Sequence, residues 1–265
     1  MIIAKSAKDL DKMRDVGELI AGVREELRAM VRPGISTMEL NNAADKMIRD
    51  AGALPTFIGY HGFPYAICAS VNDEVVHGFS KTTPLRDGDI LSLDMAATYL
   101  GFVGDTAITV PVGEITEELQ QLIKVTEECL EFGIDACRVN NRLGDVGWAV
   151  QEHAEKYGYG IVRDYTGHGI GRQMHEAPQI PNYGRPGTRD RIRAGYCFAI
   201  EPMLNMGTHE TRTLSDKWTV VTLDGKPSAH FEHTLAVTPD GPEVLTLTKE
   251  QKKLRAQPSN AALAA

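Results

Sequence analysis

Two histidines lie seven residues apart in a glycine-containing stretch, Thr166-Gly-His-Gly-Ile-Gly-Arg-Gln-Met-His-Glu176. Glycine lets a backbone turn sharply or approach a ligand closely, and the neutral imidazole is the commonest metal-binding side chain. His168 has a glycine on each side, so it is a candidate metal ligand. A single histidine is more often structural, and this interpretation therefore requires other ligands that converge on the same place.

Four carboxylates provide such candidates, because each lies in or beside an apolar stretch that is typical of a buried strand. They are Asp94, Asp105, Glu201 and Glu232. A buried carboxylate costs free energy unless it is paired or bound to a cation. One imidazole with four carboxylates is a hard set of nitrogen and oxygen donors, which suits manganese, iron, cobalt or zinc.

A hairpin is predicted to bring the first two carboxylates together. Its strands are Asp89–Ala97 and Phe102–Val110, with a break at Tyr99-Leu100-Gly101. With a two-residue loop at Tyr99-Leu100, Asp94 lies directly opposite Asp105, and the Cβ atoms are about 4.5–5.5 Å apart. Two like charges at that distance require a cation between them, and a pair of metal ions about 3.5–4 Å apart would fit.

The surrounding elements form a repeated order of helix, helix and strands. Three residues can cap helices, Ser6 with Asp9, Ser36 with Glu39, and Thr116. Apolar residues at helical spacing predict helices over about 8–31, 36–51, 116–134 and 146–157, and extended segments are predicted at 64–70, 75–78, 160–162, 196–204, 218–223 and 229–237. This order predicts an α+β fold of two related halves around a pseudo-twofold axis, with one site between them.

Composition is ordinary for a soluble globular protein. The chain has 265 residues, of which 42% are hydrophobic and 24% charged, and its net charge is −8. An acidic chain disfavours broad electrostatic binding to DNA. The four cysteines show no CxxC spacing, and we expect a cytoplasmic protein with neither a signal peptide nor a membrane span. We expect one catalytic domain over residues 1–247 and a disordered tail over 248–265.

Other catalytic motifs are excluded. His175-Glu176 begins like the HExxH zinc motif, but Pro178 breaks a helix and Gln179 occupies the position of the second histidine. The three glycines do not have the GxGxxG spacing, because Arg172 replaces the last one. No GxSxG or Walker A sequence is present.

The ordered set Asp94, Asp105, His168, Glu201, Glu232 resembles the metal site of the type I methionine aminopeptidases. The phrases Asp164-Tyr-Thr-Gly-His-Gly-Ile-Gly171, Ile200-Glu-Pro-Met203 and Phe231-Glu-His-Thr234 carry the same resemblance, which extends from about Lys8 to Thr238. It implies the "pita-bread" α+β fold, two pseudosymmetric α/β halves with antiparallel sheet around a dinuclear metal site. It also implies removal of the N-terminal methionine of nascent proteins when the second residue is small.

The resemblance assigns roles to these residues. All five would bind two divalent ions (Fe2+, Mn2+, Co2+ or Zn2+), with Asp105 and Glu232 bridging them. A water or hydroxide between the ions would be the nucleophile, and Glu201 would transfer its proton. His175 would stabilise the oxyanion and His77 would contact the scissile peptide near its nitrogen.

The resemblance also assigns a methionine pocket and a cation site. The pocket residues are Phe57, Tyr60, His61, Phe63, Cys68, Met174 and Trp218. Asn72 and Ser228 resemble a site for Na+ or K+. Three positions differ from the common family pattern, Phe57, Ala96 and Met174, and they affect the expected pocket volume and rate.

Two other functions and one surface interpretation stay open. An X-Pro aminopeptidase or prolidase would share the five ligands, but it usually has a large additional N-terminal domain. A non-catalytic binding protein on the same scaffold typically lacks some ligands. Four arginines, Arg185, Arg189, Arg191 and Arg193, form either a solvated loop or a transient docking site for ribosomal RNA.

Overall fold

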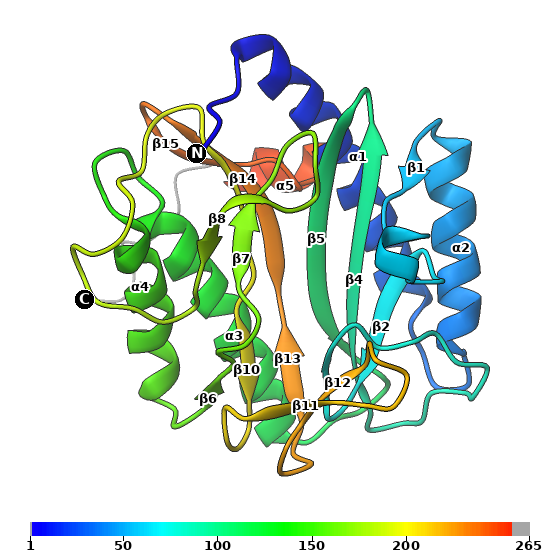
Figure 1. Ribbon diagram of the computed structural model, residues 1–265. Helices are drawn as coiled ribbons and strands as arrows, with labels where there is room; N and C mark the ends of the chain where they lie inside the picture. Colours follow the sequence, from blue (N-terminus) through cyan, green and yellow to red (C-terminus); the bar gives the residue numbers. More distant parts are fainter. Residues whose placement is uncertain (1, 256–265) are drawn as a thin grey trace.

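The computed structural model describes residues 2–255, and three of its helices begin at the predicted caps (Figure 1). Ser6 precedes α1 (Ala7–Met30) and accepts a hydrogen bond from the backbone N–H of Asp9, and Ser36 does the same for Glu39 at the start of α2 (Thr37–Asp50). Thr116 caps α3 (Glu117–Ala136), which is followed by α4 (Leu143–Glu155). Because these side chains satisfy free N–H groups of the first turn, the helix starts were predictable.

A nine-stranded sheet forms the centre of the molecule (Figure 1). Seven of its strands follow the order β1-β4-β5-β14-β9-β7-β8, and β2 pairs with β4 and β15 with β14. Their bounds are β1 (Leu54–Pro55), β2 (Ile67–Val71), β4 (Ile90–Tyr99), β5 (Phe102–Pro111), β7 (Gly167–Gly169), β8 (Glu176–Ile180), β9 (Cys197–Ile200), β14 (Glu232–Thr238) and β15 (Gly241–Val244). Every pairing in this sheet is antiparallel.

Two small sheets and the helix pairs complete the fold. One small sheet has the order β13-β10-β6 and the other β11-β12-β3. Their bounds are β3 (Glu74–Val76), β6 (Gly160–Ile161), β10 (Met203–Asn205), β11 (Thr211–Thr213), β12 (Val220–Thr222) and β13 (Ser228–His230), and a 3-10 turn η1 covers Tyr60–Gly62. Helices α1 and α2 pack near the end of the sheet that holds β1, β2, β4 and β5. Helices α3 and α4 pack near the other end, beside β8, β9 and β14 (Figure 1). The predicted succession of two helix-pair halves is therefore present.

The register of the β4–β5 hairpin differs from the predicted one. The turn consists of Leu100 and Gly101, and both have positive φ angles of 52° and 77°. Asp105 consequently pairs with Ala96, and Asp94 pairs with Ala107. The prediction that the two aspartates lie directly opposite was wrong by two residues. They still share a face as diagonal neighbours, because a shift of two preserves side-chain direction.

The two longest predicted strands of the second half are each broken next to or at a glutamate. Residues 196–204 divide into β9 and β10 at Glu201-Pro202, since proline cannot donate a ladder hydrogen bond. Residues 229–237 divide into β13 and β14 at Phe231. His233 on β14 pairs with Ile200 on β9, and His230 on β13 pairs with Met203 on β10. The residue pairing therefore keeps the same register on both sides of the break. Continuing it places Glu201 beside Glu232.

The predicted disorder from position 248 was wrong for the first residues of that segment. Lys249–Arg255 form helix α5, and residues 256–265 lie outside the described part of the chain. Thr248 and Gln251 cap this helix reciprocally, with the Gln251 backbone N–H donating to the Thr248 hydroxyl. Ion pairs from Lys252 to Glu18 and from Arg255 to Glu131 hold it against α1 and α3. Among the described helices, none has the length and apolarity to span a membrane.

Candidate metal centre

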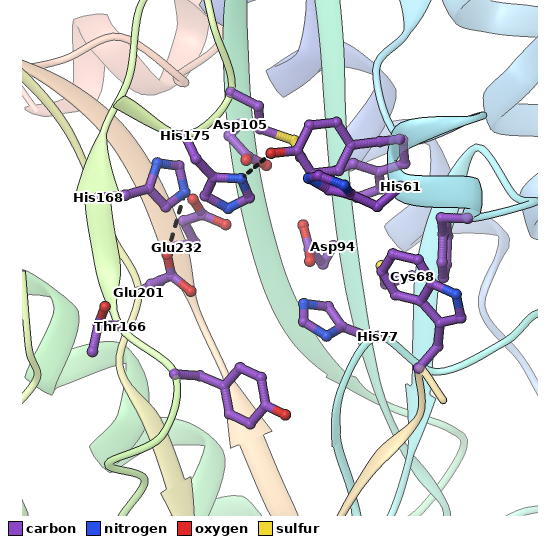
Figure 2. Close-up of a pocket in the computed structure, with 16 residues that line it drawn as sticks. His61, Cys68, His77, Asp94, Asp105, Thr166, His168, His175, Glu201 and Glu232 are labelled. Atoms are coloured by element: carbon purple, nitrogen blue, oxygen red, sulfur yellow. Dashed lines mark hydrogen bonds and ion pairs between the residues drawn. The ribbon is translucent and has the colours of Figure 1, made fainter. Parts of the chain in front are cut away.

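Each of the five predicted ligands comes from a different strand, and these strands are consecutive in the central sheet. In the order of the sheet, Asp94 lies on β4, Asp105 on β5, Glu232 on β14, Glu201 at the end of β9, and His168 on β7. Their side chains point into one pocket (Figure 2). Residues separated by more than a hundred positions therefore meet because their strands are neighbours.

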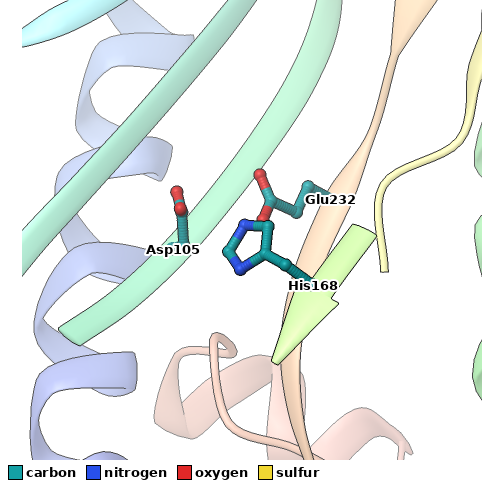
Figure 3. A group of neighbouring side chains, drawn as sticks. All are labelled: Asp105, His168 and Glu232. Atoms are coloured by element: carbon teal, nitrogen blue, oxygen red, sulfur yellow. The ribbon is translucent and has the colours of Figure 1, made fainter. Parts of the chain in front are cut away.

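Three of the five bring ligand atoms especially close together. Atoms of Asp105, His168 and Glu232 all lie within 4.8 Å of one another (Figure 3). Asp105 is 4% exposed and Glu232 is 3% exposed. One carboxylate oxygen of each, and one of Asp94, is buried without a hydrogen-bond partner. Buried carboxylate oxygens without donors are costly, so a divalent cation fits this set of residues.

The backbone around His168 determines which imidazole nitrogen faces the carboxylates. Nδ1 lies 2.9 Å from the carbonyl oxygen of Gly169, which only an Nδ1–H can satisfy. Nε2 therefore keeps its lone pair and lies 3.5 Å from Oε1 of Glu201. A Cβ at Gly167 would lie 2.4 Å from the Ala199 oxygen, and one at Gly169 would lie 2.2 Å from the Ala177 oxygen. The two glycines thus allow β7 to fit tightly between β8 and β9.

Burial gives these groups unusual acidities. It raises the pKa of Asp105 to about 7. Burial, followed by repulsion from Asp105, raises the pKa values of Asp94 and Glu201 well above the ordinary range, and the same causes act on Glu232. Burial also lowers the pKa of His168 to about 3, so its imidazole is neutral at physiological pH. Without a cation, the centre favours protonated carboxyls and a neutral imidazole.

The pocket above the ligands is a cavity of about 320 Å³. All predicted catalytic and methionine-pocket residues line it, namely Phe57, Tyr60, His61, Phe63, Cys68, His77, Met174, His175 and Trp218. Phe63 lies centrally, with its ring centroid 5.0 Å from Trp218 and 6.2 Å from Phe57. Tyr165 and Thr166 also line the cavity and were missed, although they stand only three and two residues before His168.

Two histidines border the cavity without belonging to the close ligand group. His175 lies 4.3 Å from His168 between ring centroids, and its Nδ1 is 2.7 Å from the Tyr60 hydroxyl (Figure 2). Partial burial, followed by the proximity of His61, lowers the pKa of His175. His77 packs edge-on against Tyr165 at 5.5 Å, and burial lowers its pKa to about 4.

Two threonines that the sequence interpretation missed connect the ligand strands. The hydroxyl of Thr234 lies 3.0 Å from the backbone nitrogen of Asp105 and 2.8 Å from its carbonyl oxygen. The hydroxyl of Thr106 donates to the carbonyl oxygen of Glu232 at 2.9 Å. Thr106 directly follows Asp105, and Thr234 lies two residues after Glu232. Their closeness to predicted ligands in the sequence could have identified them.

The remaining predicted sites are placed as follows. The backbone N–H of Ser228 donates to the carbonyl oxygen of Asn72 at 2.9 Å, so these two residues are brought together. The amide side chain of Asn72 bonds to Asp89 and to the backbone N–H of Ile90. Cation binding there stays a prediction. The arginines of the basic loop, Arg185, Arg189, Arg191 and Arg193, are all exposed.

Comparison with known proteins identifies the family. The model of metallopeptidase family M24 matches residues 11–239. This chain belongs to metallopeptidase family M24. It is 48% identical over 249 residues to the methionine aminopeptidase of Clostridium perfringens, covering 94% of this chain and 100% of that protein.

Solved structures of similar proteins have the same architecture. The methionine aminopeptidase of Rickettsia prowazekii is 42% identical, with a TM-score of 0.92 over 93% of this chain and 100% of that one. The expected pita-bread α+β fold is therefore confirmed. A prolidase from Pyrococcus horikoshii superposes with a TM-score of 0.75 at 19% identity, covering 94% of this chain but 65% of the prolidase. That likeness concerns the fold alone.

Proposed function

We propose that this M24 chain is a dinuclear metal-dependent aminopeptidase that releases the N-terminal methionine of peptides whose second residue is small. The observation that carries this proposal is the convergence of five donors, three with unpaired buried carboxylate oxygens, beneath an aromatic cavity. The high identity to proteins named methionine aminopeptidase supports the choice of substrate. We place the catalytic unit within residues 1–247.

The five donors are proposed to hold the metals. Asp94, Asp105, His168, Glu201 and Glu232 offer oxygen and imidazole nitrogen atoms that suit Fe2+, Mn2+, Co2+ or Zn2+. When bound, two such ions would lower the pKa of a water and polarise the peptide carbonyl. The chain itself supplies the donors, an aromatic-lined cavity and the proton-transfer groups.

Glu201 and the two pocket histidines are proposed to handle protons and developing charge. Burial raises the pKa of Glu201, so its carboxylate can accept a proton from water and return it to the leaving amine. The Tyr60 hydroxyl lies 2.7 Å from Nδ1 of His175. In the tautomer in which Nδ1 accepts this hydrogen bond, an Nε2–H would donate to the carbonyl oxygen as it becomes negative. His77 is neutral above about pH 4 and can hydrogen-bond the substrate peptide.

The cavity wall is proposed to select methionine. Aromatic rings of Phe57, Phe63 and Trp218 surround a space in which a thioether makes favourable sulfur–ring contacts. Tyr60 and His61 come from the η1 turn, where positive φ angles at Gly59 and His61 direct the chain towards the cavity. Cys68 and Met174 are buried and contribute polarisable sulfur atoms.

Three further assignments belong to this proposal. Asn72 and Ser228 would hold Na+ or K+ as a structural cation, with backbone oxygens as ligands. The exposed loop arginines, Arg185, Arg189, Arg191 and Arg193, would make transient contact with ribosomal RNA, so that nascent peptides reach the cavity. We expect the protein in the cytoplasm. Salt-dependent co-sedimentation with ribosomes tests the second assignment, and replacing all four arginines with glutamine should abolish it.

The decisive experiment measures methionine release after the metals have been removed with a chelator. We expect activity on Met-Gly-Met to return when Fe(II), Mn(II) or Co(II) is titrated in. The variant Glu201→Gln should lower kcat by about 10²–10⁴-fold, whereas Glu210→Gln, at an exposed position, should not. Preference for an X-Pro peptide, or no recovery with any metal, would contradict the proposal.

A further inference from the structure

The short segment before α1, Ile2–Ser6, which we term the N-terminal strap, passes next to the glycine-containing stretch. The Lys5 side chain is only 6% exposed. Its ammonium lies 2.7 Å from Oε2 of Glu176 and 3.0 Å from the carbonyl oxygen of Ile3. The backbone N–H of Lys5 donates to Gly195 at 2.7 Å. Lysine side chains are seldom this buried unless they are paired, and the partner here is Glu176.

Glu176 connects Lys5 to the turn that carries His175. Its Oε1 accepts the backbone N–H groups of Arg172 at 2.8 Å and Gln173 at 3.3 Å. Its Oε2 accepts the Lys5 ammonium, and the side chain is 13% exposed. One carboxylate therefore closes the turn from Arg172 to His175, and Lys5 fixes that carboxylate from the other side.

Gly171 explains why this ion pair can form. A Cβ at this position would lie 2.3 Å from Cε of Lys5 and 2.7 Å from Oε1 of Glu176. Any side chain at residue 171 would therefore displace the lysine or the carboxylate. The first two glycines of the stretch allow close strand packing around His168, whereas this third glycine makes room for the ion pair.

The ring of His175 is held at two ends. At its tip, Nδ1 bonds to the Tyr60 hydroxyl at 2.7 Å (Figure 2). At the backbone of His175, Glu176 closes the turn by accepting the Arg172 N–H, and Lys5 in turn holds the Glu176 carboxylate. His175 is exposed at the mouth of the cavity, and its ring lies against the rings of His168 and Tyr60. The polar contacts at these two ends add to the constraint from that packing.

We propose that Lys5 is a positioning residue for His175, acting through the Glu176 carboxylate and the turn that it closes. This inference rests on the proposed function and assigns the N-terminal strap a part in it. Lys5 does not line the substrate cavity. Its effect follows from geometry, since an oxyanion donor contributes fully only when its N–H lies at the right place and small displacements cost large factors in rate.

The variant Lys5→Met tests this role, because it removes the ammonium and keeps an unbranched side chain. Glu176 would still accept two backbone N–H groups, so the turn should fold but lose its outer support. We expect kcat per metal-loaded protein to fall by about 10–100-fold, with KM changed by less than about threefold. The matched control is Arg14→Met, which breaks a 2.8 Å ion pair from α1 to Glu243 outside the cavity lining and should leave kcat unchanged.

A double-mutant cycle and a spectroscopic signal complete the test. Glu176→Gln keeps an oxygen for the turn but loses the charge, and it decides the question if Lys5→Met does not fold. Lys5→Met with Glu176→Gln should be no slower than the slower single variant, because both act through one contact. The 15N resonances of the His175 ring should shift in Lys5→Met and not in Arg14→Met.

The outcomes separate the two proposals. A kcat within twofold of wild type in Lys5→Met, or an equal loss in Arg14→Met, would overturn the role of Lys5. If the wild-type protein releases no methionine with any metal, the proposed function fails instead. The His175 resonances then decide the positioning role by themselves, and unchanged resonances in Lys5→Met would refute it.

Discussion

At the residue scale, His77 shows how burial determines what a side chain can do. Its backbone has a φ of 59°, which turns the ring into the cavity between Tyr165 and Trp218. Burial, followed by the proximity of His175, lowers its pKa to about 4. At neutral pH the imidazole is therefore uncharged, which suits its proposed role of hydrogen-bonding a peptide beside the proposed metal ligands.

This acidity makes the free energy of unfolding depend on pH. An unfolded histidine has a pKa of about 6.5, so on acidification the unfolded chain binds a proton before folded His77 does. The stabilising contribution is complete above pH 6.5 and is lost as the pH falls towards 4. Between pH 7 and 5, wild type should lose about 2 kcal/mol more than His77→Asn, a residue that tolerates positive φ.

Urea unfolding of the metal-free proteins at several pH values measures that difference. Comparison between pH 7.5 and 8.5 serves as the control, because neither state protonates His77 there and the two curves should run parallel. Parallel curves over the whole range would show that His77 titrates alike in both states and would contradict the prediction.

At the element scale, hydroxyl groups connect the strands that carry the ligands. β5 and β14 pair through only two residue pairs, Glu232 with Ala107 and His233 with Thr106. Just beyond these pairs, the Thr234 hydroxyl takes the place of a backbone partner. It accepts a hydrogen bond from the N–H of Asp105 and donates one to the carbonyl oxygen of the same residue. The positions of two ligands on neighbouring strands therefore depend on one buried side chain.

Thr234→Val removes the hydroxyl and keeps the volume of the side chain, so it tests the hydrogen bonds alone. The variant leaves the buried N–H of Asp105 without an acceptor, which should lower the free energy of unfolding by about 2 kcal/mol. Affinity for the divalent metal should fall about tenfold, because Asp105 loses its support. Thermal unfolding and metal titration calorimetry measure the two effects. Thr238→Val, at the other end of β14, is the control and should leave metal affinity unchanged.

The sequence was informative about elements wherever a local interaction decides the structure. Helix starts at Ser6, Ser36 and Thr116 follow from caps that act within three residues. The register of the β4–β5 hairpin did not follow, because Leu100 adopts a positive φ that a leucine side chain does not favour. The break at Pro202 had a local signal, the missing proline N–H. The break at Phe231 had none, because there the chain passes between a small sheet and the central one.

At the scale of the whole molecule, the proposed metal centre is a consequence of sheet order. Residue type and apolar surroundings were enough to single out five candidate ligands, and the side chains of all five line one cavity. Their neighbourhood was not predictable from spacing, because the order β4-β5-β14-β9-β7 joins strands from both halves of the chain. The helix pairs α1/α2 and α3/α4 pack against different parts of the sheet and belong to different halves, so the complete centre needs both halves.

Metal removal should therefore lower the stability of the whole molecule, and by an amount that depends on pH. Burial raises the pKa of Asp105 to about 7, and the other three carboxyls are also shifted upwards, so protons compete with cations in weakly acidic solution. At a metal concentration 100 times Kd, binding stabilises the folded state by about 2.7 kcal/mol. The thermal midpoint should accordingly rise by roughly 5–10 °C at pH 7.5, and by less than half as much at pH 5.5.

Scanning calorimetry of the metal-free and Mn(II)-loaded protein gives both differences, with Glu232→Gln expected to reduce the rise at pH 7.5. An equal rise at the two pH values would mean that the carboxyls are already ionised at pH 5.5 without metal, and it would contradict the raised pKa values.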